Sequence, residues 1–271
     1  MIAFFLSMPI IAFLSLISFQ TMKLGVLNYE GRFVPYSLGV VIIYSYSYLF
    51  ALSPGLESVS MASFIFVFSI WLLGLVDDVF GKPYPKGLKG HVLYAFQNKR
   101  ITTGLVKAAG TIVVALLFVW MTPLYTYFAT FLSLFLLIGL PHVMNLFDTR
   151  PLRVWKGALC FVVLVLLINP LPSFIYIVML LSVFYVWYVL EGYRKAMLGD
   201  NGATVVGAIL AVVAINHLPI GLQLFVLFVV SFFIVIAEKY SFSTIIEHSS
   251  LLRMIDQIGI MNKHQKGDSH N

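Results

Sequence analysis

The sequence predicts an all-α protein that crosses a membrane several times, and three observations support this fold class. Hydrophobic residues make up 61% of the 271 residues, charged residues make up 10%, and the mean hydropathy is +0.97. A soluble domain of this size could not bury so much apolar surface. The apolar residues also form long runs, in a chain rich in Phe and Tyr with Pro and Gly at the ends of the runs. This pattern is typical of helices with aromatic belts rather than barrel strands.

Nine runs of roughly 17 to 25 residues with charges only at their ends predict nine transmembrane helices. They cover residues 2–20, 36–53, 60–77, 102–121, 124–144, 156–170, 173–190, 202–216 and 219–238. The first run has no basic residue before it and no small-residue cleavage site after it, so we expect a retained helix rather than a signal peptide.

The chain shows no internal repeat and no linker between domains, and we divide it into a transmembrane part, 1–240, and a cytoplasmic part, 241–271. In the second part Ile245, Leu252 and Ile255 recur at helical spacing with polar residues between them. This spacing predicts an amphipathic helix that lies in the cytoplasmic membrane interface.

The charged residues are distributed unequally between the two sides of the predicted helices. All 17 basic residues and every acidic residue except Glu57 fall on one side. By the positive-inside rule that side is cytoplasmic, which places the N-terminus outside and the C-terminus inside. The net charge of +6 is accounted for by the basic loops on this side, as is common in membrane proteins that contact anionic lipid. We therefore expect no nucleic-acid partner. Because acidic residues carry little weight in topology, their position indicates a function at the cytoplasmic face.

Four segments on the predicted cytoplasmic side carry polar residues at the same membrane depth. They are NYEGRFVP (28–35), the adjacent acids Asp77 and Asp78 with the loop KPYPKGLKG, HVMNLFDTRPLRVWKG (142–157) and MLGDNGATVVGA (197–208). Two adjacent carboxylates repel each other, and a cation relieves this repulsion. A Gly-Asp-x-Gly turn at a helix start can present N–H groups and a carboxylate to a magnesium-bridged pyrophosphate.

Each of these features also has a structural interpretation that the residues leave open. The two acids could simply end a helix, and the GDNG turn could be an ordinary N-cap. Asn145 could hydrogen-bond a neighbouring helix, and the loop cations could act only as topology determinants.

Taken together, the order LLGLVDD, KGL, NLFD and GDNGATVVG resembles the polyprenyl-phosphate N-acetylhexosamine-1-phosphate transferases, the MraY and WecA kind of membrane enzyme in glycosyltransferase family 4. The family pattern is GxxDD at a helix end, a basic KGL loop, NxxNxxDGxDGL and MGDxGSxxLG. The matches extend over roughly residues 23–210. The resemblance implies Mg²⁺-dependent transfer of a phospho-sugar from a UDP-sugar to polyprenyl phosphate at the cytoplasmic face of the cell membrane, for envelope polysaccharide assembly.

The resemblance also implies roles for individual residues. Asp200 would be the principal Mg²⁺ ligand, with Asn145 near the metal or the nucleotide. Asp77 and Asp78 would position or deprotonate the polyprenyl phosphate, and Asp148 would line the nucleotide pocket. Mn²⁺ is an alternative metal, and a homodimer is compatible with the family.

Further residues are expected to bind the anionic substrates. By the same resemblance, Lys86 and Lys107 are the candidates for phosphate-contacting lysines, and Arg32 would reach the nucleotide. We add Arg150, because a guanidinium on the cytoplasmic face next to the pocket acid can bind phosphate through two hydrogen bonds.

The chain departs from the family pattern around the third motif. His142 replaces the first Asn, and Thr149, Arg150 and Pro151 replace a glycine-containing run, which implies a reshaped nucleotide pocket. No His-rich cytoplasmic loop is present late in the chain. We therefore expect a sugar nucleotide other than the peptidoglycan pentapeptide precursor. The alternative is a non-catalytic homologue that binds polyprenyl phosphate or an envelope-assembly partner. A transporter would place polar groups near the bilayer midplane, whereas here they lie at one face of the membrane. This class of protein is therefore disfavoured.

The charge distribution gives a testable topology. A cysteine introduced at Ser269 should remain unlabelled when a membrane-impermeant thiol reagent is added outside intact cells, and should react after the membrane is opened. Labelling in intact cells would contradict the predicted orientation.

Overall fold

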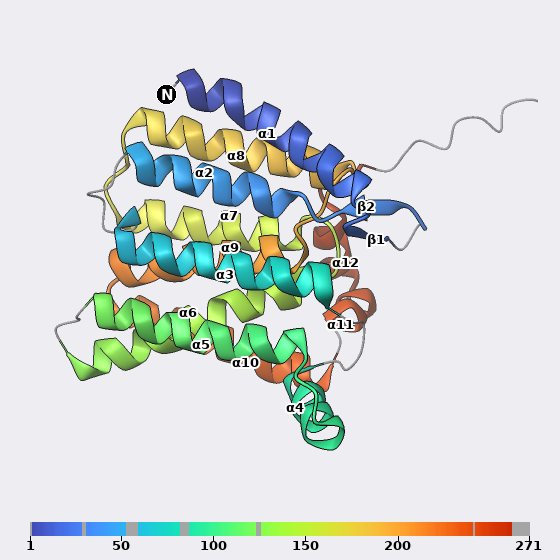
Figure 1. The fold of residues 1–271 in the computed structure, drawn as a ribbon. Coiled ribbons are helices and arrows are strands. Elements are labelled where there is room, and N and C mark those ends of the chain that lie inside the picture. Colours follow the sequence, from blue (N-terminus) through green and yellow to red (C-terminus); the bar gives the residue numbers. More distant parts are fainter. Residues whose placement is uncertain are drawn as a thin grey trace, which may run out of the picture.

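The structure is a computed structural model that describes residues 2–28, 31–52, 59–81, 87–122, 126–240 and 242–261. Figure 1 shows a bundle of helices packed side by side, with a short hairpin and three further helices at one end. The elements are α1 (Ile2–Thr21), β1 (Gly25–Leu27), β2 (Phe33–Pro35), α2 (Leu38–Leu52), α3 (Met61–Phe80), α4 (Gly87–Asn98), α5 (Thr103–Met121), α6 (Tyr127–Phe147), α7 (Arg153–Ile168), α8 (Phe174–Gly192), α9 (Gly199–His217), α10 (Ile220–Lys239), α11 (Phe242–His248) and α12 (Ser250–Gln257).

All nine predicted transmembrane segments correspond to helices in the described residues. Seven of these helices, α1, α3, α5, α6, α8, α9 and α10, are long and apolar enough to cross a membrane. The other two, α2 and α7, have 15 and 16 residues. The chain is therefore an all-α multi-pass membrane protein, as the sequence predicts. The number of helices that cross the bilayer and their orientation remain predictions.

The charged segments gather at one end of the bundle. The β1–β2 hairpin, α4, α11 and α12 all lie at this end, and the N-terminus lies at the opposite end (Figure 1). The hairpin and α4 were not expected. From the sequence we interpreted residues 23–35 and 82–101 as connections between transmembrane helices. The hairpin pairs Gly25 with Pro35 in antiparallel register. The side chain of Asn28 accepts the N–H of Arg32, which closes the turn.

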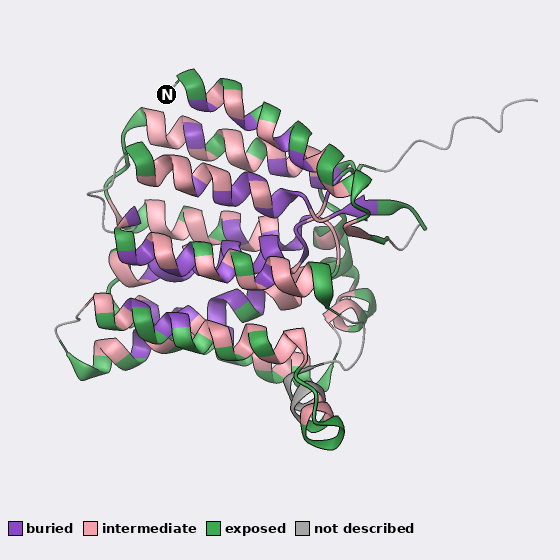
Figure 2. Ribbon diagram, in the orientation of Figure 1, coloured by how far each residue is buried: buried purple, intermediate pink, exposed green. Residues whose placement is uncertain are grey.

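Helix α9 is the centre of the bundle. In its span 72% of the residues are buried, against 50% for α6 and 28% or less for the other five candidate spans in the described residues. Figure 2 shows many of the buried residues in the middle of the bundle, where α3 and α9 lie. Small residues such as Ala203, Gly207 and Ala211 let neighbouring helices approach closely, which is how helices associate where no hydrophobic drive exists.

The contact between α3 and α9 requires a glycine at position 74. A Cβ atom at Gly74 would lie 2.6 Å from the carbonyl oxygen of Asp200 and 2.7 Å from the Cα atom of Asn201. Asp78 lies one turn further along α3, so it is on the same face as Gly74. The close approach at Gly74 therefore brings the Asp78 side chain to the start of α9.

The C-terminal part differs from the single amphipathic helix expected. It forms two helices, α11 and α12, separated at Ser249, whose side chain caps the N–H of Leu252. The apolar side chains of Leu251, Met254 and Ile258 are 59–60% exposed. The amphipathic character of the segment and its location in the membrane interface stay predictions.

Substituting Gly74 tests the close contact. We expect Gly74→Ala to lower the free energy of unfolding by about 1–3 kcal/mol, because the new methyl group overpacks the α3–α9 contact. Gly221→Ala is the matched control, since its Cβ atom would meet no atom within 4 Å. The control should change stability by less than about 1 kcal/mol. Thermal unfolding in detergent measures both, and equal effects would contradict the packing argument.

Candidate functional site

Carboxylates from two other segments cap the N-terminus of α9. The N–H groups of Asp200 and Asn201 donate to the two carboxylate oxygens of Asp78, at 3.0 and 2.8 Å. The N–H of Gly199 donates to the carboxylate of Asp148, which follows α6. The first N–H groups of a helix have no partner within it, and negative charge is favoured there. The side chain at the N-cap position of α9, Leu198, supplies no hydrogen bond, so tertiary contacts replace a local cap.

Asn201 connects this junction to the segment before α2. Its side-chain nitrogen donates to Asp78 at 2.7 Å and to the carbonyl oxygen of Tyr36 at 3.1 Å. A Cβ atom at Gly39 would collide with its side-chain oxygen. Burial raises the pKa of Tyr36 well above its usual value, and the negative charges of Asp78 and Asp200 raise it further.

A lysine lies between two of the acids. The ammonium group of Lys107, on α5, contacts a carboxylate oxygen of Asp77 at 2.6 Å and also contacts Asp200. The side chains of Lys107, Asp77 and Asp200 are 19%, 14% and 33% exposed. Three helices therefore bring one cation and two anions together at the end of the bundle, where solvent and ligands can reach them.

Asp148 is buried close to three other carboxylates, those of Glu191, Asp200 and Asp78. Burial raises its pKa well above the usual value, and the carboxylates of Glu191, Asp200 and Asp78 raise it further. The hydrogen bond from the Gly199 N–H acts in the opposite direction. Carboxylates this close together repel one another, and a cation that approaches them relieves the repulsion.

The residues present are compatible with the divalent metal that the resemblance implies. Asp77 and Asp200 already direct carboxylate oxygens to a single cationic group, and Mg²⁺ prefers oxygen ligands. The side-chain oxygen of Asn145 is buried and has no hydrogen-bond partner among the described residues. In that part of the chain no three His, Cys, Asp or Glu side chains are grouped to hold a metal by themselves. A metal at this point would have to compete with Lys107.

A polar cavity of about 300 Å³ adjoins the acids through Asp148. It lies between the β1–β2 hairpin, the turn from α6 to α7 and the turn from α8 to α9. Its charged lining residues are Asp148, Arg150, Glu191 and Arg194. Glu191 is 2% exposed and accepts the indole N–H of Trp187 at 2.7 Å. Glu191 and Arg194 were not among the site residues predicted from the sequence. The available signal was an acidic residue at the end of an apolar helix, four residues after a Trp.

The segment that departs from the family pattern binds the C-terminal helices. Arg153 forms a two-point ion pair with Asp256 at 2.6 and 2.8 Å, and these side chains are 8% and 16% exposed. Lys156 donates to the carbonyl oxygens of Ile255 and Asp256. Together these contacts fix α12 against the start of α7.

Arg150 has a weaker connection to the same region. It contacts Glu247 of α11 at 2.8 Å, and the two side chains are 33% and 58% exposed. An ion pair this exposed contributes little to stability. Arg150 can therefore exchange Glu247 for another anion at low cost.

Leu152 has a backbone conformation that usually requires a glycine. Its φ angle is +65°. Bulky residues rarely adopt this left-handed conformation, which costs on the order of 1 kcal/mol or more. The Leu152 side chain is only 1% exposed and packs near Gly192 and Gly259, so its burial offsets the strain.

The structure brings most of the predicted site residues together. Asp77, Asp78, Asp148, Asp200 and Lys107 meet around the start of α9, and Asn145 lies on α6 less than one turn before Asp148.

The remaining predicted residues lie elsewhere. Arg32 is on the exposed turn of the hairpin, Arg150 lines the polar cavity and contacts Glu247, and Lys86 lies outside the described residues. One expectation was wrong: the N–H groups of the GDNG turn do not face open space for a pyrophosphate, because Asp78 and Asp148 accept them.

A scan against protein-family models and searches of curated proteins and of solved structures found no match for this chain.

The Arg153–Asp256 pair should hold the C-terminal helices in place. We expect Arg153→Ala to destabilise the protein by about 3–5 kcal/mol, because it leaves Asp256 partly buried without its partner. Glu247→Ala is the control and should cost about 1 kcal/mol or less. Limited proteolysis of residues 242–261 and thermal unfolding measure the difference. Equal protease sensitivity in both variants would show that α12 is held by other contacts.

Proposed function

We propose that this protein transfers a sugar phosphate from a UDP-sugar to polyprenyl phosphate at the cytoplasmic membrane face, in a Mg²⁺-dependent reaction. The observation that carries the proposal is the meeting of Asp77, Lys107 and Asp200 at the ends of three membrane helices. The arrangement places cationic and anionic groups together where a lipid phosphate and a soluble nucleotide could both arrive. The sugar identity and the lipid length are not part of the proposal.

The reaction has clear electrostatic requirements. An oxygen of the lipid phosphate attacks the β-phosphorus of the UDP-sugar and forms a new P–O bond. The bond from that phosphorus to the bridging oxygen breaks, and UMP leaves with this oxygen. Several anionic oxygens must approach one another, so cationic groups are needed to offset their repulsion and to stabilise charge on the leaving group.

We assign Lys107 to this electrostatic role. Its ammonium group is within contact distance of Asp77 and Asp200, so these carboxylates hold it in a defined position. Bound Mg²⁺ would supply further charge stabilisation for the phosphate oxygens, with Asp200 and Asp77 as its carboxylate ligands. Asn145 offers a buried oxygen that has no partner among the described residues.

Asp78 and Asp148 have a different role in this proposal. Both oxygens of Asp78 accept hydrogen bonds from α9, and Asp148 accepts the Gly199 N–H. We therefore assign them to positioning the start of α9, and with it Asp200. Asp77, which does not bind the α9 backbone in this way, is the acid that faces Lys107 and the reacting phosphates.

The polar cavity is our candidate for the nucleotide. Asp148 connects it to the carboxylate cluster, and Arg150 and Arg194 give it two guanidinium groups suited to phosphate oxygens. The soluble substrate would then enter between the hairpin and the α6–α7 turn.

The second candidate function is a non-catalytic homologue that binds polyprenyl phosphate or an envelope-assembly partner. Two observations favour it. Lys107 already neutralises part of the acidic cluster, and the segment where the family pattern places a glycine-rich loop is bound by the C-terminal helices. The two functions differ in whether label moves from the nucleotide to the lipid.

Radiolabelled transfer distinguishes the two functions. Purified protein is incubated with undecaprenyl phosphate, Mg²⁺ and a panel of UDP-sugars labelled in the sugar, and the label in the lipid phase is counted. Asp200→Asn should reduce transfer at least 100-fold, since it removes a ligand charge and the partner of Lys107. Asp256→Asn is the control. It changes the ion pair with Arg153 and none of the residues around Lys107, so it should retain transfer at a temperature where the variant is folded. Wild-type activity in Asp200→Asn would contradict the proposed site, and no transfer with any sugar would favour the binding homologue.

Arg150 and Glu247 give a paired kinetic test. Arg150→Ala should raise the KM for the UDP-sugar several-fold with a smaller change in kcat, the result expected when ground-state binding is lost. Glu247→Ala should lower that KM, because it releases Arg150 from a competing carboxylate. If both variants leave the KM unchanged, Arg150 does not bind the donor and acts as a topology anchor.

A further inference from the structure

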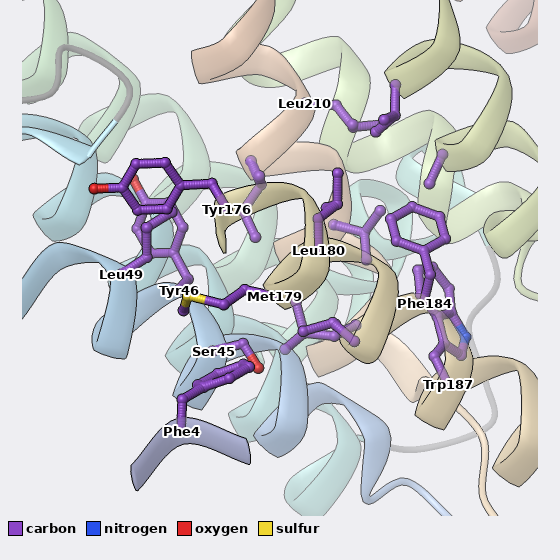
Figure 3. Close-up of a pocket in the computed structure, with 16 residues that line it drawn as sticks. Phe4, Ser45, Tyr46, Leu49, Tyr176, Met179, Leu180, Phe184, Trp187 and Leu210 are labelled. Atoms are coloured by element: carbon purple, nitrogen blue, oxygen red, sulfur yellow. The ribbon is translucent and has the colours of Figure 1, made fainter. Parts of the chain in front are cut away.

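A second cavity, of about 190 Å³, lies within the helix bundle between α1, α2, α7, α8 and α9. Figure 3 shows the side chains that surround it, from Tyr176 near the start of α8 to Trp187 near its end. These two residues are 11 positions apart, which corresponds to about 16 Å along a helix. The lining of the cavity therefore extends about 16 Å along α8.

The lining of this cavity is almost entirely hydrocarbon. Phe4, Leu49, Met179 and Leu180 are typical of the residues that form it. The few polar groups are already engaged. The hydroxyl of Ser45 donates to the carbonyl oxygen of Val41 at 2.7 Å, and the indole N–H of Trp187 donates to Glu191. A buried water needs about three polar partners, so the cavity is not a water site.

The surroundings of the cavity decide what can fill it. Three of the five helices around it, α1, α8 and α9, are candidate membrane spans, so the neighbouring medium is lipid. Several lining side chains, including Leu49, Leu180 and Val183, are partly exposed, which leaves a lateral opening between the helices. An empty cavity would lose the dispersion contacts of its lining atoms. A hydrocarbon chain from the bilayer restores them without any polar group having to be desolvated.

We propose that this cavity binds one hydrocarbon chain of a bilayer lipid. The site is separate from the carboxylate cluster, and its occupancy does not depend on the proposed transfer reaction. Trp187 forms one end of the chain site and holds Glu191, which lines the polar cavity. The chain thus packs against a residue that supports the lining of the polar cavity.

Two adjacent leucines provide a matched pair for the test. Leu180 lines the cavity, whereas Leu181 points away from it and is 59% exposed. Leu180→Trp fills the cavity, and Leu181→Trp adds the same side chain on the outer face of α8. Val183→Phe is a second filling variant.

The measurement is the amount of lipid that stays with the delipidated protein. The protein is incubated in detergent with dioleoyl phosphatidylglycerol or, separately, with undecaprenyl phosphate, passed through a gel-filtration column and analysed by mass spectrometry. Wild type and Leu181→Trp should retain about one lipid per chain, and Leu180→Trp and Val183→Phe should retain less than a third of that amount. Retention of one lipid and not the other identifies the chain chemistry. Equal retention in wild type and a folded filling variant, or no retention of either lipid by wild type, would overturn the proposal.

A second measurement does not need a filling variant to fold. In a chain with Trp71, Trp120 and Trp155 replaced by Phe, Trp187 is the remaining tryptophan. A phosphatidylcholine with a nitroxide on its acyl chain should quench Trp187 fluorescence, and the quenching should persist after free lipid is removed. Full recovery of fluorescence on removal would show that no chain is held.

Discussion

The hydrogen bonds between the start of α9 and the carboxylates of Asp78 and Asp148 are the contacts on which the rest of the site depends. Three consecutive backbone N–H groups, of Gly199, Asp200 and Asn201, donate to acids that lie 122 or 51 residues away in the chain, taking Asp200 to Asp78 and Gly199 to Asp148. The first N–H groups of a helix have no partner within the helix, and at a membrane boundary they need hydrogen-bond acceptors. No local side chain at the start of α9 accepts them, so the two distant carboxylates do. The same contacts join three charged segments of the sequence into one structure.

The position of the charges follows from this junction. The side chain of Asp78 is directed at the start of α9. The adjacent Asp77 lies on a different face of α3, where it contacts Lys107, which also contacts Asp200. Charged side chains at a bilayer are costly unless they are paired or solvated. The lysine between two carboxylates meets that requirement and keeps the group partly open to solvent. A group that is both paired and accessible can exchange its cation for a ligand, which a fully buried ion pair cannot do without a large penalty.

The segment after α6 contains two arginines with different roles. Leu152 has a left-handed backbone, and the neighbouring Arg153 binds Asp256 and does not line the polar cavity. Arg150 remains at the cavity and contacts the exposed Glu247. The buried Arg153–Asp256 ion pair therefore fixes the C-terminal helices. The exposed Arg150–Glu247 ion pair is the contact that a substrate could displace. This division of roles explains why two arginines three residues apart are expected to respond differently to substitution.

The sequence by itself determined the fold class, the nine helical segments and the gathering of acids at one end, because hydrophobic run length and charge placement are local properties that a bilayer reads directly. The order of the short motifs also indicated Asp77, Asp78, Asp148 and Asp200 as site residues. Lys107, the fifth residue that meets them at α9, lies outside these motifs and was a candidate only through the resemblance. Only the tertiary structure decided which acid caps α9 and which contacts Lys107, since adjacent residues on a helix point in directions about 100° apart and their partners come from distant segments. The Arg153–Asp256 ion pair was likewise beyond the sequence, because it joins residues 103 positions apart. The hairpin, α4 and the contact between Trp187 and Glu191 are local in the chain, but hydrophobic periodicity requires none of them.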